Sequence, residues 1–375
     1  MRDGFLHAGL GAAIEEVDEQ FAGVGGDGGA IDGELHVGRV ISGSVEERFH
    51  GTHSLSDAIK IADVFLSSVN FHAFGRKASN VGMDGPTGRV RIGISGWRYA
   101  GWRGVFYPKG LAQRRELEFA SRAFETVEIN GTFYSLQKPK SFATWARETP
   151  EDFVFSLKGS RYITHMLKLR EVKVPLANFF ASGMLSLGEK LGPLLWQFPP
   201  QMRFERERFE SFFRLLPRST RAAALLSRKY ANRVDDEDAI EVKRDAPLRH
   251  CVEIRHESFV VPEFVSLLRE HDIGLVVADT VEWPLLMDVT SDFVYCRLHG
   301  SEQLYASGYE EDALDIWADR VVSWARGEQA EGRRASAETA DVRPRDVYVY
   351  FDNDAKVRAP FDAQGLRARV ERLLE

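Results

Sequence analysis

The sequence is poor in cysteine. Cys251 and Cys296 are the only two among 375 residues, and both lie in apolar, strand-like runs. They lack the close pairing of structural zinc sites, and they are too few for a disulfide-rich secreted scaffold. We therefore interpret both residues as buried free thiols in a reducing compartment.

Long hydrophobic runs are also missing. The N-terminus lacks the basic start followed by an apolar stretch that marks a secretory signal. No stretch approaches the roughly 20 apolar residues that a membrane-spanning helix needs. We expect a cytoplasmic protein that has no membrane partner.

Residues 1–88 have no tryptophan and a single proline, although they hold 16 of the 32 glycines. The glycines do not follow a strand in the G-x-G-x-x-G spacing, which excludes a dinucleotide-binding fingerprint. An amphipathic pattern at 54–69 predicts one helix, which has too little apolar surface to form a domain alone. We predict that 1–88 is a disordered or non-native extension, and that residues 1–82 are dispensable because Met83 offers a second start.

The negative net charge is confined to this extension. Residues 1–88 carry 6 Lys and Arg against 13 Asp and Glu, whereas the remainder carries 43 of each sign. Net charge therefore indicates no particular partner for the main domain, 89–375.

Eight short apolar runs follow residue 88 at a regular rhythm. They lie at 91–95, 127–130, 153–158, 194–199, 251–255, 274–279, 293–300 and 347–354. Helical patterns separate most of them, at 114–124, 139–147, 174–191, 205–215, 262–270, 312–325 and 362–374. Eight strand–helix units predict a single-domain α/β fold, the (β/α)8 TIM barrel. A doubly wound open sheet fits less well because it needs fewer strands and a glycine-rich first turn.

Two segments interrupt the rhythm, at 219–249 and 327–345. The second is rich in Ala, Glu and Arg, and we expect a mobile loop there.

Seven segments resemble the motifs of one family. They are GISGWRYAGWRGVFYP at 93–108, VEINGTFYSL at 127–136, FSLKGSRYITH at 155–165, LGPLLWQFPP at 191–200, VEIRHESF at 252–259, YCRLHG at 295–300 and VYFDND at 349–354. The chain from about Arg89 onward thus resembles the YecE-like family, domain of unknown function 72 (DUF72). The resemblance implies a (β/α)8 barrel and no particular reaction. The last motif of the family usually reads YFNND, so Asp352 adds a carboxylate here.

Polar side chains gather near the C-terminal ends of the predicted strands, where barrels of this kind carry their chemistry. Because side chains alternate along a strand, residues two apart share a face. Three such pairs are Glu128 with Asn130, Glu253 with Arg255, and Arg297 with His299. Their apolar neighbours must meet helices, so we predict that the polar pairs point into the barrel.

Two interpretations of these charges remain open. A structural ion network of Glu128, Glu253, Arg255 and Arg297 would fill the barrel, because buried charge needs a partner. A polar active site would use the same surroundings for chemistry. For that case we assign catalytic roles to Glu128, Lys158, Glu253 and His299, of which the imidazole titrates near neutrality.

Substrate binding would use cationic, amide and aromatic groups at the same ends. Guanidinium groups stay charged and hold anions, and aromatic rings stack on sugars or bases. The candidates are Trp97, Asn130, Tyr134, Arg161, Gln197, Arg255, Arg297, Asp352 and Asn353.

A divalent metal is the one cofactor that the residues suggest. Suitable ligands are Glu128, Glu253, Asp279, His299 and Asp352. They show no fixed ligand spacing, and the neighbouring arginines oppose a cation.

The leading hypothesis is a barrel enzyme that acts on a phosphorylated or sugar-containing substrate at the C-terminal mouth. A non-catalytic nucleic-acid-binding barrel is the alternative, because basic and aromatic residues follow the third strand. A structural or regulatory barrel without chemistry is the third.

Overall fold

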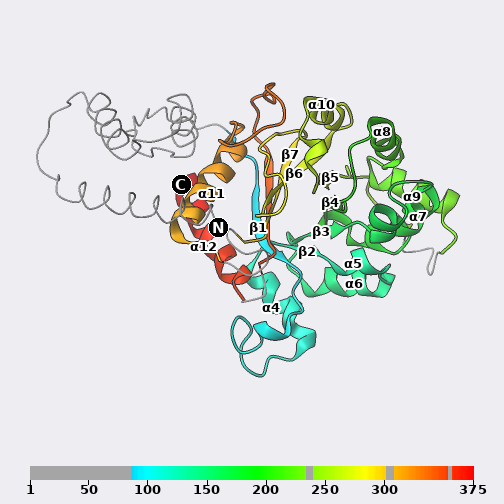
Figure 1. Cartoon of the computed structure of the whole chain (residues 1–375). Coiled ribbons are helices and arrows are strands. Elements are labelled where there is room, and N and C mark those ends of the chain that lie inside the picture. The colour runs from blue at the N-terminus through cyan, green and yellow to red at the C-terminus, as the bar shows by residue number, and fades with distance from the viewer. Residues whose placement is uncertain (1–85, 234–239, 301–307, 354–356) are drawn as a thin grey trace, which may run out of the picture. The chain divides into compact units, whose positions relative to one another are not determined.

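Eight parallel strands close into a barrel in the computed structural model, which describes residues 86–233, 240–300, 308–353 and 357–375 (Figure 1). Neighbouring strands pair in chain order, and the last pairs with the first. Their bounds are β1 (Val90–Ser95), β2 (Thr126–Ile129), β3 (Val154–Lys158), β4 (Leu191–Gln197), β5 (His250–Glu253), β6 (Ile273–Asp279), β7 (Phe293–Leu298) and β8 (Asp346–Phe351). Every strand overlaps a predicted run, and the predicted (β/α)8 fold is confirmed.

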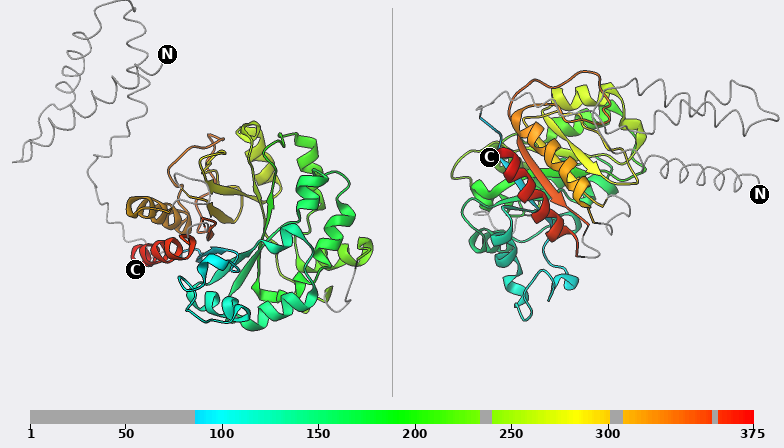
Figure 2. Two further views of the ribbon diagram at one scale, coloured as in Figure 1. Left: turned by 60° about the horizontal axis from the view of Figure 1, so that its bottom comes forward. Right: turned by 90° about the vertical axis from the view of Figure 1, so that its left-hand side faces the viewer.

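Helices form a ring outside the strands (Figure 2). The α-helices are α4 (Glu116–Ala123), α5 (Gly131–Tyr134), α6 (Pro139–Glu148), α7 (Lys173–Phe180), α8 (Arg206–Leu215), α9 (Thr220–Tyr230), α10 (Pro262–Glu270), α11 (Glu311–Arg326) and α12 (Ala359–Leu374). Short 3-10 helices occur at Ala100–Trp102, Gln113–Arg115, Met184–Lys190 and Glu257–Phe259, and a π-helix at Tyr162–Met166. The connection from β6 to β7 is described throughout and contains no helix.

The prediction of one helix over 174–191 is wrong. The helix α7 ends at Phe180, and the chain then turns at Gly183, which has a φ of 108°. Only glycine adopts this conformation without strain. A side chain there would also come within 2.5 Å of Pro139 at the start of α6. Close packing of two helices therefore interrupts the helical pattern.

Both predicted interruptions carry structure. The segment 219–249 contains α9, whose first turn is capped by Ser219, with the side chain accepting from the backbone of Ala222. The segment 327–345 is a loop that packs on the barrel rather than a free one. Asp288, from the connection after β6, accepts backbone hydrogen bonds from Ala335 and Ser336 in that loop.

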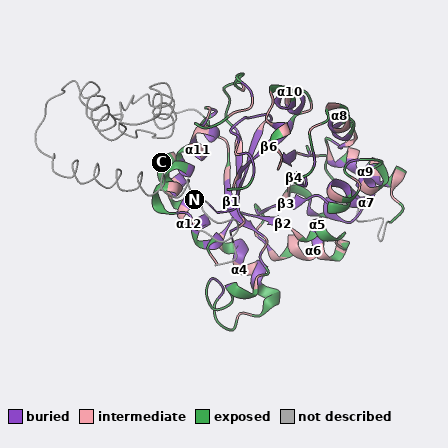
Figure 3. Cartoon of the chain, in the orientation of Figure 1, coloured by how far each residue is buried: buried purple, intermediate pink, exposed green. Residues whose placement is uncertain are grey.

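The main apolar core lies between the strands and the helix ring, and most strand residues are buried (Figure 3). A second, smaller apolar cluster fills the barrel interior. Tyr295 and Tyr350 belong to this interior layer, and their hydroxyl groups contact Ser156 and Thr126 at 2.7 Å each. Polar side chains replace apolar ones toward the C-terminal ends of the strands, which positions the candidate site.

Residues 83–375 form one compact unit. The predicted extension up to residue 85, with its expected helix at 54–69, lies outside the described residues. Within the described part of the chain, every helix is too short or too polar to cross a membrane.

Candidate active site at the barrel mouth

Arg297, near the end of β7, binds three carboxylates inside the barrel. Its Nε and Nη2 donate to Glu128 at 3.0 and 2.9 Å, and its Nη1 donates to Glu253 at 2.7 Å. Nη2 also donates to Asp352, just beyond β8, at 2.7 Å. The arginine and both glutamates are fully buried. Burial on this scale requires such pairing, because an isolated charge would cost several kcal/mol.

Further donors complete the coordination of the two glutamates. Glu128 accepts hydrogen bonds from the hydroxyl groups of Tyr295 and Ser95. Glu253 accepts from Gln197 Nε2 and from Arg255 Nε, each at 2.8 Å. Both carboxylates are thus held in fixed orientations from several strands.

Neighbouring charges favour the ionised forms of Glu253, Asp352 and Arg297. Burial alone would raise the pKa of Glu253, but Arg255 and Arg297 hold that pKa well below its usual range. Burial likewise opposes ionisation of Asp352, yet Arg297 and His299 bring the pKa of Asp352 below its ordinary value. Burial alone would lower the pKa of Arg297, but the negative charges of the three carboxylates raise this pKa well above its usual value.

His299 is part of the same network. Its Nε2 lies 3.2 Å from Arg297 Nη1, which can only donate, so Nε2 accepts. Its Nδ1 lies 3.2 Å from an Asp352 oxygen and therefore carries the proton. With both nitrogens engaged and the ring fully buried, His299 orients the network in this arrangement and offers no free nitrogen to a substrate.

Lys158, at the end of β3, is a buried charge beside the network. Only 9% of the residue is exposed, and it makes no ion pair with a described residue. Its ammonium lies 4.6 Å from the ring centre of Phe133. Burial and the charge of Arg297 lower the pKa of Lys158 to about 8, although the three carboxylates partly oppose this shift.

Arg161 and His165 lie near the same phenylalanine. The Arg161 guanidinium lies 6.0 Å from the Phe133 ring centre, and the His165 ring packs edge-on against it at 5.1 Å. Burial, followed by the charges of Arg255, Lys158 and Arg161, lowers the pKa of His165 to about 4. We call Lys158, Arg161 and Arg255 the cation cluster. The cation cluster thus adds to the effect of burial in favouring the neutral form of His165.

Trp283, in the connection after β6, forms another wall of the mouth. The Arg255 guanidinium stacks over its indole at 4.0 Å, and the His299 ring meets it edge-on at 5.8 Å. These contacts hold Arg255 beside Glu253 and shield the network from solvent.

A family model described as "Protein of unknown function DUF72" matches residues 91–374. The chain belongs to this family. Among curated relatives, YunF of Bacillus subtilis is 29% identical over 123 residues, which cover 32% of this chain and 43% of YunF. YecE of Escherichia coli K12 is 31% identical over 110 residues, or 29% of this chain and 38% of YecE. Each alignment spans less than half of the relative.

Solved structures share the fold of this DUF72 barrel. A DUF72 family protein from Thermotoga maritima, TM1631, is 26% identical with a TM-score of 0.58 and is matched over 76% of this chain and 99% of its own. A DUF72 family protein from Enterococcus faecalis, EF0366, is 17% identical with a TM-score of 0.53 over 75% and 95%. The second likeness concerns the fold alone.

Most of the predicted site residues of this DUF72 barrel lie together. The network around Arg297 contains seven of them: Glu128, Gln197, Glu253, Arg255, Arg297, His299 and Asp352. Asn130 joins it by donating to the Ser95 hydroxyl at 2.9 Å. Lys158 and Arg161 lie in the cation cluster, and Tyr134 is 69% exposed and packs edge-on against Phe133. The rings of Phe133 and Tyr134 therefore lie beside the cation cluster.

Three predicted residues lie elsewhere. Asn353 donates to Asp362 of α12 at 2.8 Å, and Asp279 accepts from the Trp317 indole of α11 at 3.0 Å. Both face the helix ring because the adjacent strand position points inward. Trp97 is buried with its ring edge-on against Trp145 of α6 at 5.4 Å, so it packs against this helix.

Sequence reasoning missed five residues of the site. Ser95 and Tyr295 follow from the same alternation that placed Arg297, since Tyr295 lies two positions before it. Phe133 lies in the short helix α5, His165 in the π-helix and Trp283 in the connection after β6. No local sequence pattern reveals which way these side chains point.

The structure also bears on the metal hypothesis. The nitrogens of Arg297 lie between Glu128, Glu253 and Asp352, where a shared cation would have to bind. Across the described residues, no cluster of three or more potential ligands could hold a metal ion. The residues present thus suit an arginine better than a metal at this position.

Proposed function

We propose that this DUF72 barrel is an enzyme that binds a phosphorylated or otherwise anionic sugar at its mouth, with Lys158 as the reactive amine. The observation that carries the proposal is the buried ammonium of Lys158, which has no ion-pair partner among the described residues. A buried cation without a counter-ion is costly, and an anionic ligand would remove that cost.

Neighbouring donors suit the same ligand. Arg161 also lacks an ion pair in the described structure, and Arg255 uses Nε and Nη2 for Glu253, which leaves Nη1 for a ligand. Guanidinium groups bind phosphate oxygens through charge-assisted hydrogen bonds. Tyr134, exposed beside Phe133, offers a face for a sugar ring.

Lys158 is also suited to proton transfer. With a pKa of about 8, roughly one molecule in ten carries the neutral amine at pH 7. That amine can accept a proton from a bound substrate or attack a carbonyl carbon. In this proposal Glu128, Glu253, Arg297 and His299 do not touch the substrate but hold the electrostatic surroundings of Lys158 constant.

Calorimetric titration tests the binding step. We expect inorganic phosphate and glucose 6-phosphate to bind more tightly than glucose. The substitutions Lys158→Met and Arg161→Ala should each weaken phosphate binding by about 10- to 150-fold, the range for hydrogen bonds to charged groups. The matched control is Lys109→Met, which removes an exposed lysine elsewhere. The binding proposal fails if phosphate does not bind, or binds equally well to Lys158→Met.

Catalysis needs its own test. Phosphorus NMR of a panel of sugar phosphates should show conversion by the unsubstituted protein and none by Lys158→Met. Binding without conversion of any of them would argue for a binding protein instead.

A non-catalytic nucleic-acid binder is the second candidate. It is favoured by the exposed rings of Tyr134 and Tyr162 beside Arg161, since stacking rings next to cations suit single strands. An oligonucleotide that binds far more tightly than a mononucleotide, with an affinity that falls steeply with salt, would favour it over the enzyme.

A further inference from the structure

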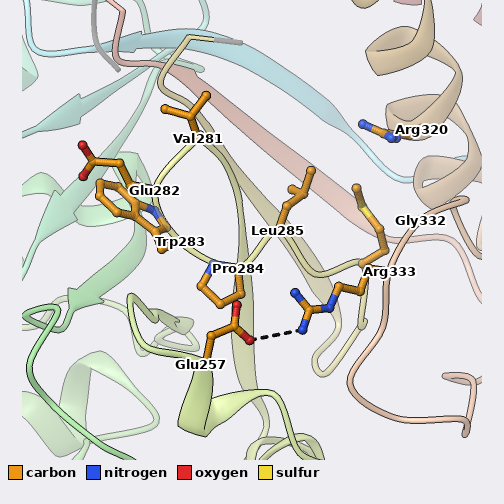
Figure 4. Close-up of a pocket in the computed structure, with 10 residues that line it drawn as sticks. Glu257, Val281, Glu282, Trp283, Pro284, Leu285, Arg320, Gly332 and Arg333 are labelled. Atoms are coloured by element: carbon orange, nitrogen blue, oxygen red, sulfur yellow. Dashed lines mark hydrogen bonds and ion pairs between the residues drawn. The ribbon is translucent and has the colours of Figure 1, made fainter. Parts of the chain in front are cut away.

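A cavity of about 440 Å³ lies next to Trp283 and is lined by four segments of the chain (Figure 4). Trp283, Pro284, Leu285 and Met287 come from the connection after β6 and form an apolar wall. Arg320 enters from α11, and Arg333 from the loop that follows α11. The volume is in the usual range of small-molecule sites, roughly 300–1,000 Å³.

Hydrogen bonds between two connections hold this cavity open. The backbone nitrogen of Met287 donates to the Arg333 carbonyl oxygen at 2.8 Å. The carboxylate of Asp288 accepts from the backbone nitrogens of Ala335 and Ser336 at 2.7 and 3.0 Å. The walls are therefore fixed before a ligand arrives, which lowers the entropic cost of binding.

The two arginines of this cavity differ in their pairing. Arg333 forms an ion pair with Glu257 at 3.1 Å, which Figure 4 shows at one edge of the cavity. Arg320 lies over the Trp317 ring at 4.9 Å and makes no hydrogen bond or ion pair with a described residue. The Arg320 guanidinium thus borders an apolar wall without a direct partner among the described residues, although it interacts at longer range with the Asp279 carboxylate. Glu257 and Glu282 also line the cavity.

We propose that this cavity binds a small carboxylate that has an aromatic or branched apolar body. The carboxylate accepts hydrogen bonds from Arg320, whose fork of donors matches two oxygens. The apolar body packs on Trp283, Pro284 and Leu285, where burial of carbon supplies the remaining affinity. Both parts are needed, because an exposed single ion pair contributes little by itself.

This site is separate from the anion site proposed around Lys158, although Trp283 borders both. The binding proposal does not depend on the proposed enzyme function.

Benzoate is the probe for the test, with saturation-transfer difference NMR to detect contact and calorimetry to measure affinity. We expect benzoate to bind more tightly than neutral benzamide. The substitution Arg320→Leu should weaken benzoate about tenfold or more, and Arg320→Lys should restore part of the loss. The control Lys158→Met should leave benzoate binding unchanged, which separates this site from the mouth.

Thermal melts establish that each variant folds. If Arg320→Leu does not fold, Leu285→Trp, which fills the cavity, serves instead and should abolish benzoate binding. The proposal is overturned if benzoate gives no signal, if benzamide binds equally well, or if benzoate binds the folded Arg320 and Leu285 variants as it binds the unsubstituted protein. Loss of benzoate binding in Lys158→Met would also overturn it, because the ligand would then be in the mouth.

Discussion

Replacing Arg297 by methionine should destabilise the barrel more than any other single charge removal inside it. The substitution leaves Glu128, Glu253 and Asp352 buried without their common partner. Removing one member of a buried ion pair costs about 3–5 kcal/mol. For a barrel of about 290 residues, unfolding entropy near 2.1 cal/mol/K per residue converts this loss into a fall in Tm of about 5–8 °C.

The pH dependence of this loss has a definite sign. The folded-state pKa values of Glu253 and Asp352 lie below their ordinary values, so their ionisation stabilises the fold above the unfolded-state pKa of about 4. That contribution disappears as the pH falls through the lowered pKa values. Arg297→Met loses the part of this contribution that Arg297 supplies, whereas the parts supplied by Arg255 and His299 remain. The difference in Tm between the two proteins should therefore be full near pH 7 and become smaller as the pH falls below about 4.

Differential scanning calorimetry at the two pH values measures both effects. The matched control is Arg244→Met, which breaks an ion pair with Glu189 whose side chains are 83% and 79% exposed. It should change the unfolding free energy by less than about 1 kcal/mol. Adding Glu253→Gln and Asp352→Asn to Arg297→Met should recover part of the stability. If Arg297→Met and the control Arg244→Met have the same Tm near pH 7, the carboxylates must be solvated. The description of a buried ion network would then be wrong.

Three further outcomes follow. Sulfate keeps its charge between pH 6 and pH 10. Its affinity for the mouth should therefore fall as the pH rises through about 8, because Lys158 loses its proton there. An affinity that does not change with pH would show that Lys158 is not part of the anion site. Burial raises the pKa of Cys251 and Cys296. A thiol reagent should therefore label neither cysteine in the native protein and both cysteines in denaturant. Rapid labelling of the native protein would contradict their burial. In Gly159→Ala the new Cβ would lie 2.3 Å from the Trp196 ring, and urea unfolding should show a loss of about 1–3 kcal/mol; an unchanged midpoint would mean that the ring moves freely.

The eight strands could be predicted because each is a short apolar run set off from an amphipathic helical pattern. Inward pairs such as Glu253 with Arg255 could also be predicted, since the side-chain period of a strand is two. The same rule predicts that Asp352 and Asn353 point to opposite sides, because adjacent residues of an extended segment cannot both face inward.

Other features depend on contacts between distant segments. The break in the helical pattern at Gly183 depends on Pro139, which lies on another helix. The wall that Trp283 forms beside Arg255 depends on a connection without regular structure. Likewise, no local pattern distinguishes Arg297, which has three carboxylate partners, from Lys158, which makes no ion pair with a residue that the structure describes.

Asp352 gives the mouth a means of adjusting the chemistry of an amine that it does not touch. Its negative charge raises the pKa of Lys158, while burial and Arg297 lower it. An uncharged asparagine at this position, as in the YFNND motif, would therefore leave Lys158 neutral over more of the physiological pH range. We therefore expect the residue at position 352 to influence how often the amine of Lys158 is neutral and, in the proposed enzyme, how often that amine can react.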